Sequence, residues 1–560
     1  MASRLAIYHP QGQIAFGGKP FGKDVANRDL FAALAIHGGY EQIDILTHGN
    51  ITAEALTEQL LHGRVVGTRI AAGHILSQRP AVDAGVMLRG KADLANIAWL
   101  RRRASGDTAY SLVGLIHTIA PPAVRDYIAA AAIAPVQPWD ALICTSPSVQ
   151  RAMEQMFDDW GGFLADRFGG TRRPRPQLPL VPLGVDAPTI EAMADDGAAR
   201  AAVRAEFGMA DDDIMVLWVG RLSFFEKAFP QPMFRAVEEA AAATGAKVQF
   251  VLAGWFPGGE RDRSRYEAAA RAYAPNCTVC FVGGEDRARI GALWAGGDVF
   301  ISLVDNIQET FGITPVEAMA AGLPVVVSDW DGYRYTVRDG EEGFTIPTLG
   351  GPANRSGYAM ASRHTLLLDG YQIYAGQVAQ HTAVHVGKAA EALAALIRSP
   401  ELRRKMGQAG RARVRSTFDW PVVVAALQAV LAELAAIRAA APVPTSQDWL
   451  FNPVRGDPFH DFAGFATGVL SPDTMLAIHP GAGMGDLKRA SGVALDQFAS
   501  NWRASMEECA RILDLVAAGQ APTVAALTRH FPPQRRWQIE LGLMWMMKLG
   551  LLDWLEAPPA

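Results

Sequence analysis

The sequence predicts an α/β protein with two successive parallel-sheet regions and a C-terminal part that is mainly helical. Strand patterns alternate with helix patterns over residues 1–186 and again over residues 187–440. Between Asp298 and Pro347 a strand, a loop, a helix start and another strand follow in order, which indicates a βαβ unit of a parallel sheet. Residues 447–560 carry helix patterns after an irregular, Gly/Pro/Phe-rich beginning.

Composition excludes several classes of protein. The chain has 560 residues, half of them apolar, and a formal net charge of −5, which argues against a dedicated nucleic-acid binder. No signal-peptide pattern opens it, and no uninterrupted apolar run approaches the roughly 20 residues that span a bilayer. Few cysteines over this length indicate a reduced, cytoplasmic protein: Cys144, Cys277, Cys280 and Cys509.

The first region begins with a strand, Leu5 to Tyr8, followed by a loop with Gly17 and Gly18. A helix from about Lys23 to Ile36 and a strand from Ile43 to Leu46 come next. Paired glycines between a first strand and a helix let the backbone approach a ligand closely. A loop with no ligand explains the two glycines equally well.

His117 directly follows an apolar strand, Leu112 to Ile116. At the carboxyl end of a parallel strand its side chain would point toward a ligand crevice, although a structural histidine is the alternative. Nearby, Trp99 to Gly106 is a small basic cluster with an aromatic neighbour. It is typical of a solvated helix end, and peripheral contact with the inner face of a membrane is the alternative.

The second region contains a strand from Ile214 to Val219, then Gly220-Arg221, with Lys227 further along the same loop. Arginine can chelate phosphate oxygens in a fork, and lysine acts as a mobile point charge, so the pair suits a diphosphate. Two loop cations alone indicate little. Further strands are expected at 248–254 and 279–283, and the Cys277/Cys280 pair reads as structural rather than as a metal or redox site.

The βαβ unit itself can be placed closely. Val299 to Val304 and Val325 to Ser328 are its strands, and a loop covers Asp305 to Ile313. Thr314 at the N-cap, proline at the first helical position and Glu317 at the third would form a capping box.

Two carboxylates bracket the end of this loop, Glu309 within the loop and Glu317 inside the helix. The intervening backbone N–H groups, at a helix N-terminus, would form an anion cradle; they belong to Phe311, Gly312 and Ile313. The following Asp329-Trp330-Asp331 also matches a metal-binding loop, but we interpret it as a turn.

These residues resemble a known family. Glu309 and Glu317 in an E-x7-E pattern, followed by AMAAGLPVV, a Ser-Asp, a glycine and DGxxGF, are similar to the donor-site signature of retaining glycosyltransferase family 4. The resemblance covers residues ~1–440. It implies a GT-B fold: two Rossmann-like domains, 1–186 and 187–440, that face a cleft, with the final helices crossing back to the first domain.

The resemblance also implies an activity: transfer of a sugar, with retention, from a nucleotide-sugar donor to an unidentified glycan, lipid or protein acceptor. It implies no cofactor and no obligatory metal. His117, Glu309, Arg221 and Lys227 would act in catalysis. The donor-binding set would be Gly17, Gly18, Arg221, Lys227, Glu309, Phe311, Gly312, Ile313, Thr314 and Glu317. Two alternatives stay open: a sugar-nucleotide epimerase or hydrolase on the same fold, and a non-catalytic scaffold with a partner-binding tail.

Two segments lie outside the family pattern. Residues 349–379 hold glycines and aromatics without clean periodicity and are expected to be an insertion. In the appended domain, 447–560, helices are expected at 493–517, 523–531 and 534–555, the last two resembling half of a winged helix. A stripe of Trp537, Leu541, Met544 and Trp545 is expected to pack in the tail's own core, or to dock on the catalytic domains or a second subunit.

Overall fold

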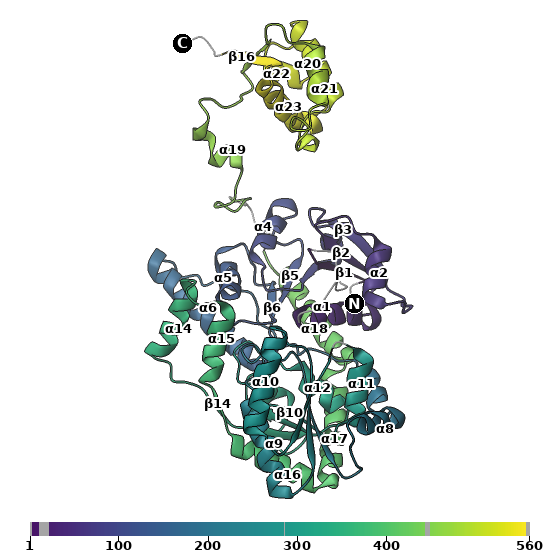
Figure 1. Cartoon of the computed structure of the whole chain (residues 1–560). Coiled ribbons are helices and arrows are strands. Elements are labelled where there is room, and N and C mark those ends of the chain that lie inside the picture. Colours follow the sequence, from purple (N-terminus) through teal and green to yellow (C-terminus); the bar gives the residue numbers. More distant parts are fainter. Residues whose placement is uncertain (1–2, 11–21, 285, 443–448, 556–560) are drawn as a thin grey trace. The chain divides into compact units, whose positions relative to one another are not determined.

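The computed structural model describes residues 3–10, 22–284, 286–442 and 449–555. The chain divides into two compact units, Met1–Asn452 and Pro453–Ala560. In the larger unit, two sheets are flanked by helices (Figure 1).

The first sheet has the strand order of a Rossmann fold. Its six parallel strands run β3-β2-β1-β4-β5-β6. They are β1 (Arg4–Tyr8), β2 (Gln42–Thr47), β3 (Arg69–His74), β4 (Val86–Arg89), β5 (Ser111–Leu115) and β6 (Ala141–Ile143). The helices are α1 (Gly22–His37), α2 (Ala53–Leu61), α3 (Arg79–Ala84), α4 (Ala95–Ala104), α5 (Pro122–Ala129) and α6 (Pro147–Phe168).

The second sheet repeats this order with its own strands, as β12-β11-β10-β7-β8-β9, again all parallel. They are β7 (Ile214–Val219), β8 (Val248–Ala253), β9 (Thr278–Val282), β10 (Val299–Ser302), β11 (Val325–Ser328) and β12 (Gly343–Ile346). Its helices are α7 (Ala187–Ala194), α8 (Gly197–Glu206), α9 (Gln231–Thr244), α10 (Glu260–Tyr273), α11 (Arg287–Gly296), α12 (Ile313–Ala320), α13 (Tyr333–Thr336), α16 (Val386–Arg398) and α17 (Pro400–Arg413). Two Rossmann-like domains in one chain are the GT-B arrangement, and the predicted fold class is confirmed.

Each sheet is buried on both faces, which explains its nearly continuous apolar strands. In β7, Val216 and Trp218 belong to the core on one face, whereas Met215 and Leu217 belong to the core on the other. A strand with this pattern needs helices on both sides, and the sequence supplies them between successive strands.

Helix α18 (Trp420–Ala439) returns to the first domain. Val423, Leu427 and Leu434 are buried in the core on one face of the first sheet, and Gln428 Nε2 donates to the Gly38 carbonyl at 2.6 Å. Among the described residues it is the one helix long and apolar enough, by length and composition, to cross a membrane. Polar residues interrupt its apolar run, so the sequence search for uninterrupted runs passed over it.

Residues 349–379 form an ordered helical hairpin. Helices α14 (Arg355–Thr365) and α15 (Tyr371–Gln380) are enclosed by a short antiparallel pair, β13 (Thr348–Leu349) and β14 (Ala383–Val384). None of the side chains of α14 is buried. A helix that buries nothing has no need of an apolar stripe, which is why the sequence showed no clean periodicity here.

The expected capping box at Thr314 is wrong. The N-cap of α12 is Gly312, and the helix begins at Ile313, with no side-chain cap. Gly312 has φ +86°, and a Cβ at this position would lie 1.9 Å from Cε1 of Tyr333. Only glycine fits there, so the chain enters the helix two residues earlier than the capping pattern predicted.

The smaller unit has its own core. Its elements are α19 (Pro458–Asp461), β15 (Met475–Ile478), α20 (Met484–Ser491), α21 (Met506–Ala517), α22 (Val524–Thr528), α23 (Arg536–Lys548) and β16 (Leu552–Leu555). Helices α21, α22 and α23 pack together, as expected for a tail with a core of its own. Strands β15 and β16 pair antiparallel.

Three details of the tail differ from the sequence reading. Helix α21 starts at Met506 rather than Val493, after a capping box of Ser505 and Glu508. Helix α23 ends at Lys548, because Gly550 turns the chain with φ +66°, and 552–555 is a strand. The predicted apolar stripe is also on the wrong face: Trp537 and Met544 are 45% and 46% exposed, and the buried positions are Ile539, Gly542, Leu543, Met546 and Met547.

Candidate active site

The carboxyl ends of the two sheets meet. His117 follows β5, and its carbonyl accepts a hydrogen bond from Oγ1 of Thr310, which follows β10, at 2.9 Å. Thr145 Oγ1 donates to the Thr310 carbonyl at 3.2 Å. Ser146 Oγ donates to Oδ1 of Asp331, which follows β11, at 2.8 Å. In open parallel sheets these strand ends are where ligands bind, and here both domains contribute.

Both predicted phosphate-binding cations lie at this edge. Arg221 Nη1 is 3.1 Å from Glu226 Oε2, and Lys227 Nζ is 3.1 Å from Glu309 Oε2. The Arg221 and Glu226 side chains are only 14% and 10% exposed. The loop after β7 therefore holds two cations with a carboxylate opposite each. Sequence reasoning missed Glu226, which only its place between the two cations could have suggested.

Glu309 occupies the anion cradle that was expected to be open to a ligand. Its Oε1 accepts hydrogen bonds from the backbone N–H of Thr310 at 3.3 Å, Phe311 at 3.5 Å and Gly312 at 3.1 Å. Burial opposes ionisation of this carboxyl, but Lys227 and the N–H groups outweigh it and hold its pKa below the ordinary value. The loop after β10 is thus organised around its own carboxylate.

Glu317 lies one turn inside α12 and has a different electrostatic environment. Burial, together with repulsion from Asp29 on α1, raises its pKa to about 7, against the opposing attraction of Arg287. This carboxyl changes charge near neutral pH.

His117 is held as a neutral ring. Its Nε2 lies 2.9 Å from Oδ1 of Asn27, and Asn27 Nδ2 donates to the Gly90 carbonyl at 2.9 Å. Because that second bond orients the amide, Nε2 of His117 carries the proton and donates it to Asn27. Burial lowers the pKa of His117 to about 4, although the backbone of Gly90 opposes this shift. The ring is therefore uncharged at neutral pH.

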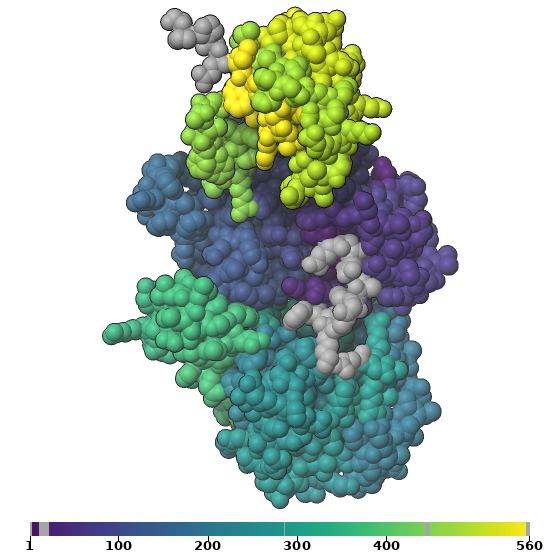
Figure 2. Space-filling view, turned by 45° about the horizontal axis from the view of Figure 1, so that its top comes forward, coloured from purple at the N-terminus to yellow at the C-terminus, as the bar shows by residue number. Residues whose placement is uncertain are grey.

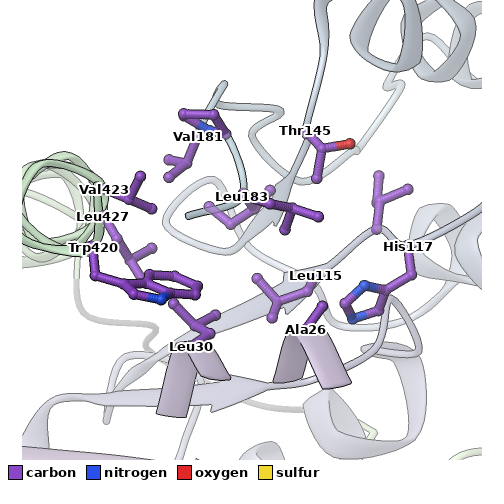
Figure 3. Close-up of a pocket in the computed structure, with 13 residues that line it drawn as sticks. Ala26, Leu30, Leu115, His117, Thr145, Val181, Leu183, Trp420, Val423 and Leu427 are labelled. Carbon is purple, nitrogen blue, oxygen red and sulfur yellow. The ribbon is translucent and has the colours of Figure 1, made fainter. Parts of the chain in front are cut away.

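An apolar pocket lies beside His117 rather than beside the two cations (Figure 3). It is enclosed by α1, the ends of β5 and β6, and α18. Its lining is Ala26, Leu30, Leu115, Ile116, His117, Ile143, Thr145, Val181, Pro182, Leu183, Trp420, Val423 and Leu427. The first domain thus offers an apolar recess with His117 and Thr145 as its polar groups.

Asp329 and Asp331 behave as turn residues. Asp329 pairs with Arg334 at 2.6 Å, and Asp331 has φ +38°, a left-handed conformation that aspartate tolerates. Burial and repulsion from Glu309 raise the pKa of Asp331 to about 7, against the bond from Ser146. Within the described residues no group of three or more His, Cys, Asp or Glu side chains could hold a metal.

The remaining predicted site residues divide into three groups. Gly17 and Gly18 lie outside the described residues. Phe311 contributes its backbone N–H, because its ring is buried against Phe418. Ile313 and Thr314 form the first turn of α12, half-buried. Cys277 and Cys280 are free thiols, consistent with a structural role.

The segment that carries this geometry also matches known proteins. Residues 199–349 match the family of glycosyl transferases group 1. The matched range runs from α8 through β13, and therefore includes Arg221, Lys227, Glu309 and Glu317.

Two curated proteins illustrate the similarity of the chain to known glycosyltransferases. The chain is 35% identical over 153 residues to a phosphatidyl-myo-inositol mannosyltransferase of Mycobacterium leprae, covering 27% of this chain and 31% of that one. It is 29% identical over 149 residues to a D-inositol 3-phosphate glycosyltransferase of Mycobacteroides abscessus, covering 27% and 32%. The match thus spans about a third of the length of these relatives.

Solved structures resemble the chain at low sequence identity. Sucrose-phosphate synthase from Thermosynechococcus elongatus aligns with a TM-score of 0.49 and 18% identity, over 78% of this chain and 100% of that one. HepE of Anabaena, solved with UDP-glucose, aligns with a TM-score of 0.48 and 18% identity, over 77% and 99%.

Proposed function

We propose that this protein is a glycosyltransferase that moves a sugar from a nucleotide-sugar donor to a glycan, lipid or protein acceptor. The observation that carries the proposal is the meeting of Arg221, Lys227 and Glu309 with His117 at the joined strand ends of two Rossmann-like domains. The match of residues 199–349 to glycosyl transferases group 1 supports it.

The two cations take the diphosphate. When the bond between the sugar C1 and the diphosphate oxygen breaks, the electron pair leaves with the diphosphate. Arg221 and Lys227 stabilise the charge that grows there, which is work done in the transition state. Their carboxylate partners, Glu226 and Glu309, hold them in place before the donor arrives.

The other side chains act on the sugar and the ribose. Glu309 keeps the loop after β10 in position and faces the donor sugar, and His117, as a neutral ring, contacts the sugar near the reacting carbon. Glu317 binds the ribose hydroxyls. The acceptor hydroxyl enters from the first domain and its oxygen bonds to C1, while its proton passes to an oxygen of the departing diphosphate.

The finer assignments belong to the same proposal. The E-x7-E signature favours retention of anomeric configuration. It also favours a reaction without an obligatory metal, in which Arg221 and Lys227 of the β7 loop stabilise the charge that a metal ion would otherwise stabilise. All four cysteines are unpaired, which supports a cytoplasmic location, with peripheral membrane contact for a lipid acceptor.

A two-stage experiment tests the proposal. A panel of UDP-, GDP- and ADP-sugars is screened by thermal shift, since a ligand that binds the native state raises the melting temperature. The stabilising donor is then incubated with candidate acceptors, and the anomeric configuration of the product is read by NMR. Absence of stabilisation by every donor and every free nucleoside diphosphate would overturn the proposal. Release of free sugar or an isomer without any acceptor would instead favour a hydrolase or epimerase.

A further inference from the structure

The inserted hairpin of α14 and α15 is internally fixed. Arg363 binds Asp369 through Nε at 2.7 Å and Nη2 at 2.9 Å, which closes the turn between the two helices. The His364 and Tyr374 rings stack with centroids 5.0 Å apart. In Figure 2 the hairpin is the green projection on one flank of the larger unit. The hairpin therefore has a defined internal structure of its own.

One side of α15 packs on the loop that carries the two cations. Ala375 and Ala379 are buried, and a Cβ on Gly376 would lie 3.0 Å from Cβ of Phe225. Phe225 lies between Arg221 and Lys227 in sequence, and its carbonyl accepts a hydrogen bond from Asn306 Nδ2. The hairpin thus supports the β7 loop, which is bonded in turn to the loop after β10.

Tyr371, the first residue of α15, reaches the loop after β10 directly. Its hydroxyl donates to Gln308 Oε1 at 2.8 Å, one residue before Glu309. Thr118, adjacent to His117 in the first domain, and the Arg221–Glu226 pair both lie close enough to Tyr371 to influence its pKa. Tyr371 therefore hydrogen-bonds to the loop after β10 and lies near both the β7 loop and the first domain.

We propose that this hairpin is a third component of the donor site and that Tyr371 is its positioning residue. By holding Gln308, Tyr371 keeps the backbone of 309–312 in the conformation in which Glu309 binds its own N–H groups and Lys227. The catalytic part of this inference rests on the proposed function. The structural part, that Tyr371 positions residues 309–312, does not. Diphosphate binding depends on Arg221 and Lys227, so the effect of Tyr371 falls on turnover more than on nucleotide affinity.

Hydrogen exchange tests the structural claim without any substrate. The full-length variant Tyr371→Phe keeps the ring and removes the hydroxyl. Tyr374→Phe, one turn along α15, is the matched control. We expect the amides of 309–312 to exchange about fivefold faster or more in Tyr371→Phe, as loss of one hydrogen bond implies, and at the wild-type rate in Tyr374→Phe. Unchanged exchange in Tyr371→Phe, or equal acceleration in both variants, overturns the proposal.

Kinetics test the catalytic claim with the donor found by screening. Tyr371→Phe should lower kcat about fivefold to tenfold, with the Kd for the free nucleoside diphosphate, UDP or GDP, changed less than about twofold. Gln308→Ala should have a similar effect, and the double variant should be no worse than either single one, because both remove the same bond. If the losses of kcat in the two single variants add in the double variant, Tyr371 and Gln308 do not act through one hydrogen bond, and the proposal is overturned. A wild-type protein that binds no nucleotide contradicts the proposed function instead, and leaves the exchange experiment to decide the role of Tyr371.

Discussion

Lys227 Nζ lies 3.1 Å from Glu309 Oε2, and this ion pair joins the loop after β7 to the loop after β10. Lys227 is 37% exposed while Glu309 is 11% exposed, so the carboxylate is the buried partner and the ammonium is the one that faces solvent. Lysine can therefore turn toward an incoming diphosphate, while Glu309 stays anchored by backbone N–H groups.

Replacement of Glu309 tests this arrangement. Glu309→Gln keeps the shape but removes the charge that pairs with Lys227, so we expect a folded protein whose turnover falls about 100-fold or more, the usual scale for loss of a preorganised active-site group. Steady-state kinetics with circular dichroism measures it. Glu239→Gln, in an exposed pair with Arg235, is the control. Near-normal turnover in folded Glu309→Gln would remove Glu309 from the site.

The roles of Arg221 and Lys227 can be tested by measuring the affinity for the nucleoside diphosphate alone. Arg221→Ala and Lys227→Ala should each weaken binding of the nucleoside diphosphate about tenfold or more, because a hydrogen bond to a charged group contributes roughly 1.5–3 kcal/mol. Isothermal calorimetry measures the change. Lys247→Ala is the control, because Lys247 pairs with Asp213 at the opposite, amino end of β7. If neither site variant loses affinity, the phosphate site lies elsewhere.

The raised pKa of Asp331 predicts that the stability of the folded protein depends on pH. Its pKa is raised from 3.8 to about 7 in the folded protein, so between these values the folded state holds a proton that the unfolded state has lost. Its contribution to stability is complete below the lower value and disappears as pH rises through the higher one. Asp331→Asn cannot ionise and tolerates the same left-handed backbone.

The melting temperatures of Asp331→Asn and wild type should therefore diverge as pH rises from about 4 to about 7, with the variant a few degrees higher at the alkaline end. A constant difference across the range would mean that Asp331 is ionised throughout.

The interpretation of Asp329 and Asp331 as turn residues predicts metal independence. Both carboxylates already have partners in the chain, Arg334 and Ser146. We expect transfer activity to persist in excess chelator, measured in a coupled assay whose own enzymes need no metal. Complete loss of activity that magnesium restores would contradict this interpretation.

Removal of the smaller unit should leave nucleotide binding intact. Every residue placed in the donor site belongs to the unit that ends at Asn452, and α18 completes that unit's core. A chain ending at Asn452 should bind the nucleoside diphosphate with unchanged affinity by calorimetry, while acceptor use or oligomeric state changes. If the shortened chain is folded by circular dichroism yet binds no nucleotide, the boundary or the site is wrong.

Local pattern was sufficient to place several strands and to choose the candidate site residues. The strands at 214–219 and 325–328 were placed with their observed bounds, because a strand buried on both faces is a short apolar run between turn residues. Arg221, Lys227, Glu309 and His117 were predicted as site residues from their places after strands of a parallel sheet, and the family resemblance gave those places their weight; their roles stay predictions.

Long-range contact decided what the local patterns could not. The start of α12 depends on Tyr333, whose ring leaves room only for glycine at position 312. The face of α23 was misread because its aromatic residues are exposed and its packing is set by α21 and α22. Tyr371 gave no signal, since 63 residues separate it from Gln308. The spacing of residues in the sequence predicts contacts within an element and its adjoining loop. Contacts between distant segments form only when the chain folds, so the spacing does not reveal them.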